Sequence, residues 1–293
     1  KTVIVVPGPS AQGLGKKVVE GLNAQTVELN VKAFPDGEYS LRFEGDLTDK
    51  EVVVVQTTGA PQDTNLMQLL LSLDAVKDLG AKKVTAVVPY LAFARQDKRF
   101  LAGEGVSSKT VIKLIQACNI DKFVTVNIHA KAVLDWFSVP TMNLSAITLL
   151  AQDFKNKGLS GAFALSPDKG AIKLAEEADK VLCGGCGWLR KERDRYTGEI
   201  QVEEKCLNVE GKDVIVFDDI ISTGGTIARA IKMLKSQGAR RVFAACVHPL
   251  LIGEAKTKIM EAGAEEIVGT DSIPSTVRQV SLAPLIVEAL SAR

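Results

Sequence analysis

The sequence predicts an α/β protein built from two tandem, doubly wound domains with mostly parallel sheets. Short apolar runs without polar alternation are typical of strands buried on both faces, and they recur at residues 3–6, 52–55, 84–88 and 214–217. Segments with helical spacing of apolar residues lie between them, as alternating strands and helices require. The chain has 293 residues, which is enough for two domains with substantial cores.

Each expected element follows from the spacing of apolar residues and from the turn or cap residues at its ends. In the first half the expected strands are at residues 3–6, 39–43, 52–55, 84–88 and 123–126, and the strand at 39–43 is half-exposed. The expected helices are at 12–22, between the strands at 52–55 and 84–88, and from Ser107 to Cys118. The second of these helices is capped by Asp63 or Thr64 and ends at Gly80. In the second half they are strands at 163–166, 214–217 and 242–247, a strand near Ile267, helices that begin near Ile227 and Glu254, and a final helix at 283–291.

A repeated motif indicates that the two domains are related by internal duplication. Leu79-Gly-Ala-Lys-Lys-Val84 corresponds to Gln237-Gly-Ala-Arg-Arg-Val242, and in both places a helical pattern ends at glycine before a buried strand. Val139-Pro140 marks the expected crossing between the domains. We therefore expect a first domain over residues 1–144, a second over residues 145–282, and a final helical segment at 283–293.

The composition excludes several classes of protein. The formal net charge is +1, so no broad attraction to nucleic acid or to a membrane surface is expected. No apolar run approaches the roughly 18 residues of a membrane span, and no signal peptide is visible, which favours a cytoplasmic protein. The five cysteines form no disulfide framework. For Cys183-Gly-Gly-Cys186 we favour a buried structural pair over redox or metal chemistry, because a zinc ribbon needs a second such pair.

The most informative stretch is Asp218-Asp219-Ile-Ile-Ser222-Thr223-Gly224-Gly225-Thr226, which follows a buried strand and precedes a helix. Open α/β sheets bind ligands at this position, beyond the carboxyl ends of the strands. Backbone N–H groups at the start of a helix favour phosphate, and glycines let the main chain close around it. The hydroxyl groups of Ser222, Thr223 and Thr226 add further donors.

The two carboxylates indicate which kind of phosphate compound fits this loop. Asp218 and Asp219 would repel a bare phosphate, but they can hold sugar hydroxyls or a metal bound to the ligand. The loop also lacks the Gly-Lys-Ser/Thr ending of a P-loop. A phosphorylated sugar is therefore favoured over the tail of a nucleoside triphosphate, and the alternative is an ordinary acidic turn with a glycine hinge.

The first domain lacks this loop, because Gln56-Thr-Thr-Gly59 follows the corresponding strand. It carries instead a cationic segment, Arg95-Gln96-Asp97-Lys98, after the strand at residues 84–88. Arg95 can clamp phosphate bidentately, and Lys98 supplies a mobile point charge. A solvated basic loop is the alternative interpretation.

The turn Phe34-Pro35-Asp36-Gly37-Glu38 makes that alternative less attractive. Phe34 can stack on a base, while Asp36 or Glu38 reads the amino edge of the base. The first domain is thus expected to meet a different ligand from the second.

Together these motifs resemble the ribose-phosphate pyrophosphokinase (PRPP synthetase) family over essentially the whole chain. The matching motifs, in family order, are Phe34-Pro-Asp-Gly-Glu38, Leu66-Met-Gln-Leu-Leu70, Pro89-Tyr90, Ala94-Arg95-Gln96-Asp97-Lys98 and the loop from Asp218 to Thr226. The resemblance implies two phosphoribosyltransferase-like domains, with the final helix packed back on the first. It implies ATP contacts from Phe34, Asp36, Glu38, Arg95, Gln96, Asp97 and Lys98, and a ribose-5-phosphate site at Asp218, Asp219, Ser222, Thr223, Gly224, Gly225 and Thr226.

The resemblance also supplies roles for residues whose sequence context is ambiguous. It implies that His129 and Asp168 are linked to Mg²⁺, although a structural histidine and a surface turn explain the same residues. It assigns Lys191 and Arg193 to a mobile catalytic loop, for which a salt-bridged hairpin tip is the alternative. In relatives the adenine-binding residues reach across a subunit boundary, so a homo-oligomer is implied.

The implied reaction is transfer of the β,γ-diphosphoryl group of ATP to the 1-hydroxyl of ribose 5-phosphate, which gives PRPP and AMP for nucleotide biosynthesis. A phosphoribosyltransferase is one rival function, but it would not need a first domain that carries the cationic segment. A catalytically silent regulatory subunit is the other rival. Such relatives degrade the sugar-phosphate loop or the catalytic loop, and both look intact in this sequence.

Four segments depart from the usual family pattern, and one of them is Thr141-Met-Asn143-Leu144, where the family has an acidic Asp-Asn-Leu version. Asn127 stands where the family has Asp in an Asp-x-His pair, which removes a negative charge near His129. Ser222 replaces an aspartate that many relatives carry, and Gly103-Glu-Gly-Val-Ser107 differs from the Ala-Pro-Ile-Ser type of the phosphate-activated members. The sequence thus resembles members outside that group, and weak or absent control by phosphate and ADP is expected.

Overall fold

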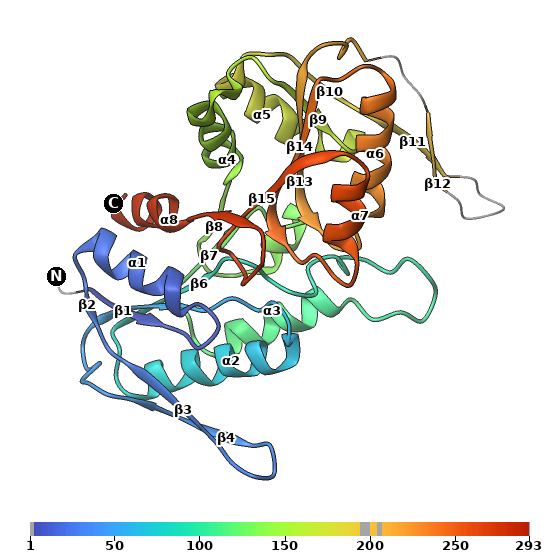
Figure 1. The fold of residues 1–293 in the computed structure, drawn as a ribbon. Helices are drawn as coiled ribbons and strands as arrows, with labels where there is room; N and C mark the ends of the chain where they lie inside the picture. The colour runs from blue at the N-terminus through green and yellow to red at the C-terminus, as the bar shows by residue number, and fades with distance from the viewer. Residues whose placement is uncertain (1–2, 194–199, 204–206, 293) are drawn as a thin grey trace. The chain divides into compact units, whose positions relative to one another are not determined.

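The computed structural model describes residues 3–193, 200–203 and 207–292, with residues 190–193 and 200–203 described as backbone only. The chain divides into two compact units, one formed by Lys1–Leu144 with Ser281–Arg293 and the other by Ser145–Val280. Each unit is an α/β structure around a parallel sheet (Figure 1). The predicted fold class is confirmed.

The first unit contains a six-stranded parallel sheet with the strand order β2-β1-β5-β6-β7-β8. These strands are β1 (Val3–Pro7), β2 (Gln25–Thr26), β5 (Glu51–Val55), β6 (Lys83–Val88), β7 (Lys122–Val126) and β8 (Thr141–Leu144). One face is covered by α1 (Gln12–Leu22) and the C-terminal α8 (Ala283–Ser291), and the other by α2 (Gln62–Asp78) and α3 (Ser107–Ala117) (Figure 1). An antiparallel hairpin of β3 (Leu29–Ala33) and β4 (Tyr39–Phe43) completes the unit.

The second unit contains a parallel sheet of the same size, with the strand order β10-β9-β13-β14-β15-β16. These strands are β9 (Phe163–Ser166), β10 (Cys186–Trp188), β13 (Asp213–Ile221), β14 (Arg241–Pro249), β15 (Ala264–Thr270) and β16 (Arg278–Val280). α4 (Ile147–Phe154) packs with α5 (Ile172–Leu182), and α6 (Gly225–Ser236) packs with α7 (Ala255–Glu261). β11 (Arg190–Arg193) pairs antiparallel with β12 (Ile200–Glu203).

Corresponding positions of the two sheets carry corresponding sequence. β5 and β13 hold the third place in their sheets, and β6 and β14 hold the fourth. The repeated motif precedes both fourth strands, and its glycines, Gly80 (φ +85°) and Gly238 (φ +84°), share the left-handed conformation that glycine adopts without strain. This agreement of order, motif and backbone supports an internal duplication.

The apolar runs form the cores of the two units, as their lack of alternation predicts. Every residue from Val52 to Val55 is at most 6% exposed, and the four apolar residues from Val214 to Phe217 are fully buried. A strand that is apolar on both sides needs helices on both faces of its sheet, which is the arrangement in each unit.

Several element boundaries differ from those expected. β13 does not end at Phe217 but continues through Asp218 and Asp219 to Ile221, because its ladder with β14 continues. α2 begins at Gln62, so Asp63 lies inside its first turn instead of capping it. The hydroxyl of Ser107 does not cap α3, because it donates to the side-chain oxygen of Gln96. The short elements β2, β3, β8, β10 and α4 were not expected from the sequence pattern.

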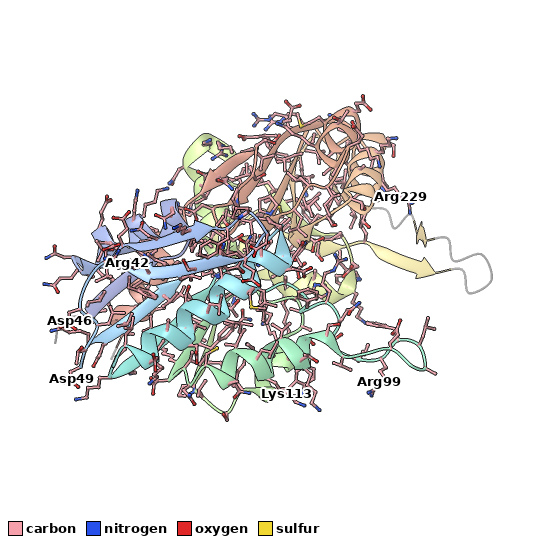
Figure 2. The ribbon with its side chains drawn as sticks, turned by 90° about the horizontal axis from the view of Figure 1, so that it is seen from below. Arg42, Asp46, Asp49, Arg99, Lys113 and Arg229 are labelled. Atoms are coloured by element: carbon pink, nitrogen blue, oxygen red, sulfur yellow. The ribbon has the colours of Figure 1, made fainter. Side chains whose placement is uncertain are left out.

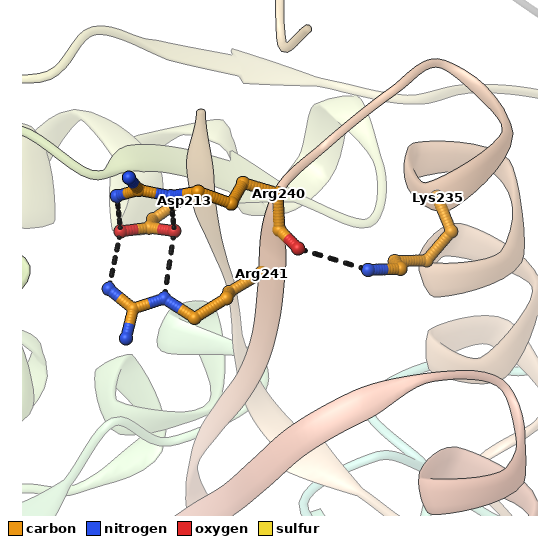
Figure 3. A network of polar contacts seen from close by, with 4 residues as sticks. All are labelled: Asp213, Lys235, Arg240 and Arg241. Carbon is orange, nitrogen blue, oxygen red and sulfur yellow. Dashed lines mark hydrogen bonds and ion pairs between the residues drawn. The ribbon is translucent and has the colours of Figure 1, made fainter. Parts of the chain in front are cut away.

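Asp213, the first residue of β13, is held by two arginines at the opposite end of the strand from the acidic pair. Arg240 and Arg241 each donate from Nε at 3.0 Å and from Nη2 at 2.7 Å to its carboxylate (Figure 3). The side chain of Asp213 is 8% exposed, while those of the arginines are 63% and 45% exposed. The hydrogen bonds from Arg241 and Arg240 hold the pKa of Asp213 well below its usual range.

We predict that Asp213→Ala lowers the free energy of unfolding by about 2–3 kcal/mol near pH 7, because it removes charge-assisted hydrogen bonds to a buried carboxylate. The pKa of Asp213 is lower in the folded chain than in the unfolded chain. The stabilisation is therefore complete above a pH of about 4 and is lost as the pH falls towards the folded-state pKa. Urea unfolding of the parent and of Asp213→Ala at pH 7 and pH 3 measures the difference in their free energies of unfolding.

The control for this experiment is Glu44→Ala. Arg42 Nε and Glu44 form an exposed ion pair at 3.3 Å, with side chains 80% and 39% exposed (Arg42 in Figure 2). Exposed pairs contribute little, so this change should cost less than about 0.5 kcal/mol. Equal losses for the two variants would contradict the special role of Asp213.

Candidate functional site

The acidic pair lies at the carboxyl end of β13, on the strand itself. The Oδ1 atom of Asp218 accepts from the backbone N–H of Asp219 at 2.9 Å, and that of Asp219 accepts from the N–H of Ile220 at 2.8 Å. Asp218 is the register partner of Cys246 on β14, a fully buried thiol. The strand ladder therefore fixes both carboxylates at the ligand-binding edge of the second sheet.

The ionised form of Asp218 is disfavoured in the folded chain. Burial, and then the neighbouring carboxylate of Asp219, raise the pKa of Asp218 well above its usual range, and the charge of Asp168 acts in the same direction. Burial also raises the pKa of the Cys246 thiol, and the charge of Asp218 adds to this shift. A cation or hydroxyl donors at this edge would stabilise the negative charge that these groups carry when ionised.

The loop after β13 closes tightly before α6. Gly224 has φ +76°, and a Cβ atom there would lie 3.0 Å from the backbone oxygen of Ala255, so both the conformation and the space require glycine. α6 begins at Gly225, and no side chain of the described residues caps it. The loop thus presents the amino end of a 12-residue helix beside the hydroxyls of Ser222, Thr223 and Thr226. Such an end favours an anion.

In the first unit, the cationic segment is anchored to the start of α3. The side-chain oxygen of Gln96 accepts from Ser107 Oγ at 2.5 Å, and its backbone oxygen accepts from Ser108 Oγ at 2.7 Å. Arg95 and Lys98 are exposed, and Lys98 Nζ lies 5.4 Å from the ring centre of Phe100. Asp97 is half-buried. Gln96 therefore positions the segment, while its two cations remain accessible.

The turn of the β3–β4 hairpin carries the three residues predicted to meet a base. The N–H of Phe34 donates to the backbone oxygen of Glu38 at 2.7 Å, and the N–H of Glu38 donates to Asp36 Oδ1 at 3.1 Å. Phe34 is 40% exposed, with Lys32 Nζ 5.6 Å from its ring centre. The hairpin turn is ordered by its own hydrogen bonds and leaves an aromatic ring accessible.

His129 and Asp168, the predicted magnesium residues, follow β7 and β9 in different units. Asn127 has φ +39°, a left-handed conformation that asparagine tolerates well, and its N–H donates to Leu144 at 2.8 Å. His129 is exposed. Asp168 accepts from the N–H of Ala171 at 3.1 Å, at the start of the 3-10 helix η3 (Lys169–Ala171).

A metal ion within one unit would need several donor side chains close together. Among the residues described, no group of three or more His, Cys, Asp or Glu side chains is arranged to hold a metal ion. Asp168 does lie near enough to Asp218 to raise its pKa, so carboxylate oxygens, the ligands that Mg²⁺ prefers, gather at this edge. These oxygens are donors of the kind that Mg²⁺ prefers, although the described residues form no complete ligand set.

Lys191 and Arg193, the predicted catalytic-loop residues, belong to β11. Their backbone pairs with Val202 and Ile200 of β12. Their side chains lie outside the part of the chain that the structure describes.

The corresponding edge of the first sheet is filled by its own side chains. The side-chain oxygen of Gln56, just after β5, accepts from the N–H of Ser10 at 3.0 Å, and its amide donates to the backbone of Asn65 at 3.2 Å. A Cβ on Gly8 would lie 2.3 Å from the same oxygen. Gln56 is fully buried. It occupies the position in the first sheet that corresponds to the acidic pair, and its own side chain fills that position.

Comparison with known proteins gives the same class as the fold and the site. Residues 3–118 match the family model described as the N-terminal domain of ribose phosphate pyrophosphokinase, and residues 140–276 match the phosphoribosyl transferase domain. The fold and the loop at the end of β13 thus define a protein with two phosphoribosyltransferase-type domains.

Relatives of known name narrow this class to one family. The chain is 43% identical to a ribose-phosphate pyrophosphokinase of Methanobrevibacter smithii, over 98% of this chain and 99% of the relative. It is 38% identical to that of Saccharolobus solfataricus, over 92% and 93%. A crystal structure of phosphoribosylpyrophosphate synthetase from Mycobacterium smegmatis has a TM-score of 0.89 at 29% identity, covering 100% of this chain and 98% of that chain. The chain belongs to the ribose-phosphate pyrophosphokinase family, the transferases of PRPP synthesis. The family resemblance predicted from the sequence is therefore confirmed.

Within the described residues, the structure has no helix of the length and apolar character needed to cross a membrane.

The two loop glycines provide a matched pair for a stability test. We predict that Gly224→Ala lowers the free energy of unfolding by about 1–2 kcal/mol, because alanine is strained at positive φ and crowds Ala255. Gly225→Ala should be neutral or slightly stabilising, because its Cβ would meet nothing within 4 Å. Urea unfolding and ribose-5-phosphate titration of both variants test this. Equal effects on stability would show that the loop does not depend on the Gly224 conformation.

The raised pKa of Asp218 has a consequence for stability. A carboxyl group whose pKa is higher in the folded chain stabilises that chain at low pH and loses this contribution as the pH rises through the folded-state value. We therefore predict that Asp218→Asn raises the free energy of unfolding of the ligand-free protein at pH 8 by about 1–3 kcal/mol, with little effect at pH 4.

Thermal unfolding at the two pH values measures the effect of Asp218→Asn. A variant less stable than the parent at pH 8 would refute the electrostatic account.

Proposed function

We propose that the protein transfers the β,γ-diphosphoryl group of ATP to the 1-hydroxyl of ribose 5-phosphate, forming PRPP and AMP for nucleotide biosynthesis in the cytoplasm. The hydroxyl oxygen bonds to the β-phosphorus while the bond from that phosphorus to the α,β-bridging oxygen breaks. AMP leaves, and the hydroxyl proton is released. The observation that carries this proposal is the acidic pair on β13 directly before a phosphate-type helix start.

The second unit would hold the pentose phosphate. The 5-phosphate would be bound by Ser222, Thr223, Gly224, Gly225 and Thr226, through backbone N–H groups and hydroxyls at the amino end of α6. Asp218 and Asp219 would accept hydrogen bonds from the ribose hydroxyls. This division explains why two carboxylates stand beside an anion site: they orient the sugar and keep out a bare phosphate.

The first unit would bind ATP. Arg95 and Lys98 supply exposed positive charge for its phosphates, with Gln96 and Asp97 in the same segment. Phe34 supplies an accessible ring for the adenine, beside Asp36 and Glu38. Because the hairpin turn holds these three residues apart from the six-stranded sheet, we propose that they serve the ATP site of a neighbouring copy in a homo-oligomer.

His129 and Asp168 are the residues that would hold Mg²⁺, which when bound neutralises charge on the phosphate oxygens. Phosphoryl-type transfer leaves the protein mainly positioning and charge stabilisation to provide. Lys191 and Arg193 would supply cations to the transferring group. The strand pair that carries them is antiparallel. We propose that this segment is the catalytic loop.

One assay separates this function from its rivals. The protein is incubated with Mg–ATP and ribose 5-phosphate, and AMP is quantified. AMP that depends on the sugar supports the proposal. Pyrophosphate release from PRPP with a purine base, without AMP formation, would instead identify a phosphoribosyltransferase. Neither product would identify a silent regulatory subunit.

We predict that Lys191→Ala lowers kcat by about 10²-fold or more, since a cation that stabilises charge only during transfer acts on the transition state. The Kd for ribose 5-phosphate should remain within about twofold of the parent value. Steady-state kinetics and calorimetry measure the two quantities. Lys232→Ala, an exposed lysine on α6, is the control and should change neither. Near-normal turnover of Lys191→Ala would remove this residue from the mechanism.

A further inference from the structure

Leu251 adopts a backbone conformation that leucine rarely occupies. Its φ is +45°, and in the second unit the only other described non-glycine residue with positive φ is Cys183. A bulky side chain in this region is strained, and such residues persist where the surrounding structure determines them, often near functional sites. Glycine would adopt the same conformation freely, so the leucine side chain needs an explanation of its own.

The backbone around Leu251 supports the sugar-phosphate loop. The N–H of Leu251 donates to the backbone oxygen of Ile221 at 3.0 Å, and the N–H of Ile252 donates to that of Ser222 at 2.9 Å. These bonds extend the pairing of β13 and β14 beyond Ile221↔Pro249, up to the first residue of the loop. They hold the carbonyls of Ile221 and Ser222, which directly precede Ser222 and Thr223.

The left-handed turn at Leu251 then directs the chain towards α7. The first residue of that helix, Ala255, is the residue against which Gly224 packs, with a Cβ there only 3.0 Å from the Ala255 oxygen. The segment from Leu251 to Ala255 therefore contacts the loop at both Ser222 and Gly224. Through these contacts the segment supports the loop.

The side chain of Leu251 anchors this segment to the second unit. It is half-buried and packs against the hydrophobic core of the second unit, whose members include Ile221, Ile227 and Ile259. Ile221 ends β13, Ile227 belongs to the first turns of α6, and Ile259 belongs to α7. The core on which Leu251 packs therefore includes residues of the three elements that border the loop.

We propose that Leu251 is a positioning residue for ribose 5-phosphate. Its core-anchored side chain holds a strained turn, and that turn fixes the backbone of residues 221–224 in the geometry that receives the 5-phosphate. This inference rests on the proposed function for the identity of the ligand. It adds a residue that does not touch the ligand and acts only through the loop.

The experiment measures binding of ribose 5-phosphate and, separately, of Mg–ATP to the full chain by isothermal titration calorimetry. Leu251→Gly keeps the backbone conformation accessible but removes the anchor. Leu251→Ala keeps the strain with a shorter side chain and carries the test if the glycine variant does not fold. Leu251→Met keeps a long apolar side chain and should restore the anchor.

Two control variants separate positioning from general loss of stability. Leu207 is also half-buried against the same core, but its N–H donates to Gln237 at the other end of α6, so Leu207→Gly removes a similar contact away from the loop. Phe93 has φ +66° in the first unit, where its backbone oxygen accepts from the N–H of Gln96 at 3.0 Å. Phe93→Gly is therefore the equivalent change beside the cationic segment.

The expected result is a Kd for ribose 5-phosphate raised at least tenfold in Leu251→Gly and within twofold of the parent in Leu251→Met, Leu207→Gly and Phe93→Gly. The Kd for Mg–ATP should stay within twofold in all Leu251 variants. An unchanged Kd for ribose 5-phosphate in Leu251→Gly, or an equal loss in Leu207→Gly, would overturn the proposal. If the parent binds ribose 5-phosphate without making AMP, the proposed reaction fails, yet these constants still decide the role of Leu251. If the parent does not bind the sugar phosphate, both fail.

Discussion

The structure of the second unit depends on holding two adjacent carboxylates at the end of a buried parallel strand. Asp218 and Asp219 both belong to β13, and Asp218 pairs with Cys246 of β14, so the strand keeps both residues at this edge of the sheet. Burial and mutual repulsion make this arrangement unfavourable for the free protein, as the raised pKa of Asp218 records. The buried apolar strands on both sides of β13 contribute favourable free energy that offsets this electrostatic cost. Hydroxyl donors or a cation at this edge would offset that cost.

The duplicated architecture places different side chains on the same order of strands. Both sheets have the same order, and both fourth strands follow the same glycine-ended helix motif. At the third strand the copies diverge: Gln56 satisfies its own hydrogen bonds inside the first unit, whereas Asp218 and Asp219 remain at the edge of the second. The segment after the fourth strand diverges as well, into accessible cations in the first unit and into a support for the loop in the second. The two copies therefore differ at these carboxyl edges, while the order of the strands is retained.

The sequence was sufficient for the fold because short apolar runs and glycine-ended helices are local signals. It also indicates the loop from Asp218 to Thr226 as the candidate site, since Thr-Gly-Gly-Thr after two carboxylates is a compact pattern. It could not place Asp218 on the strand, because that depends on pairing with Cys246 in β14. The bond of Ser107 to Gln96, the fork of two arginines on Asp213, and the contact of Leu251 with the loop also join distant segments. No local pattern encodes such contacts, and they emerge only when the units are folded.

The most direct test of this account is a crystal structure of the protein with ribose 5-phosphate. The 5-phosphate is expected at the amino end of α6, within hydrogen-bonding distance of backbone N–H groups between Ser222 and Thr226. The ribose hydroxyls are expected at Asp218 and Asp219. Sugar phosphate bound beside Gln56, or at any place that leaves the acidic pair without a ligand, would contradict it.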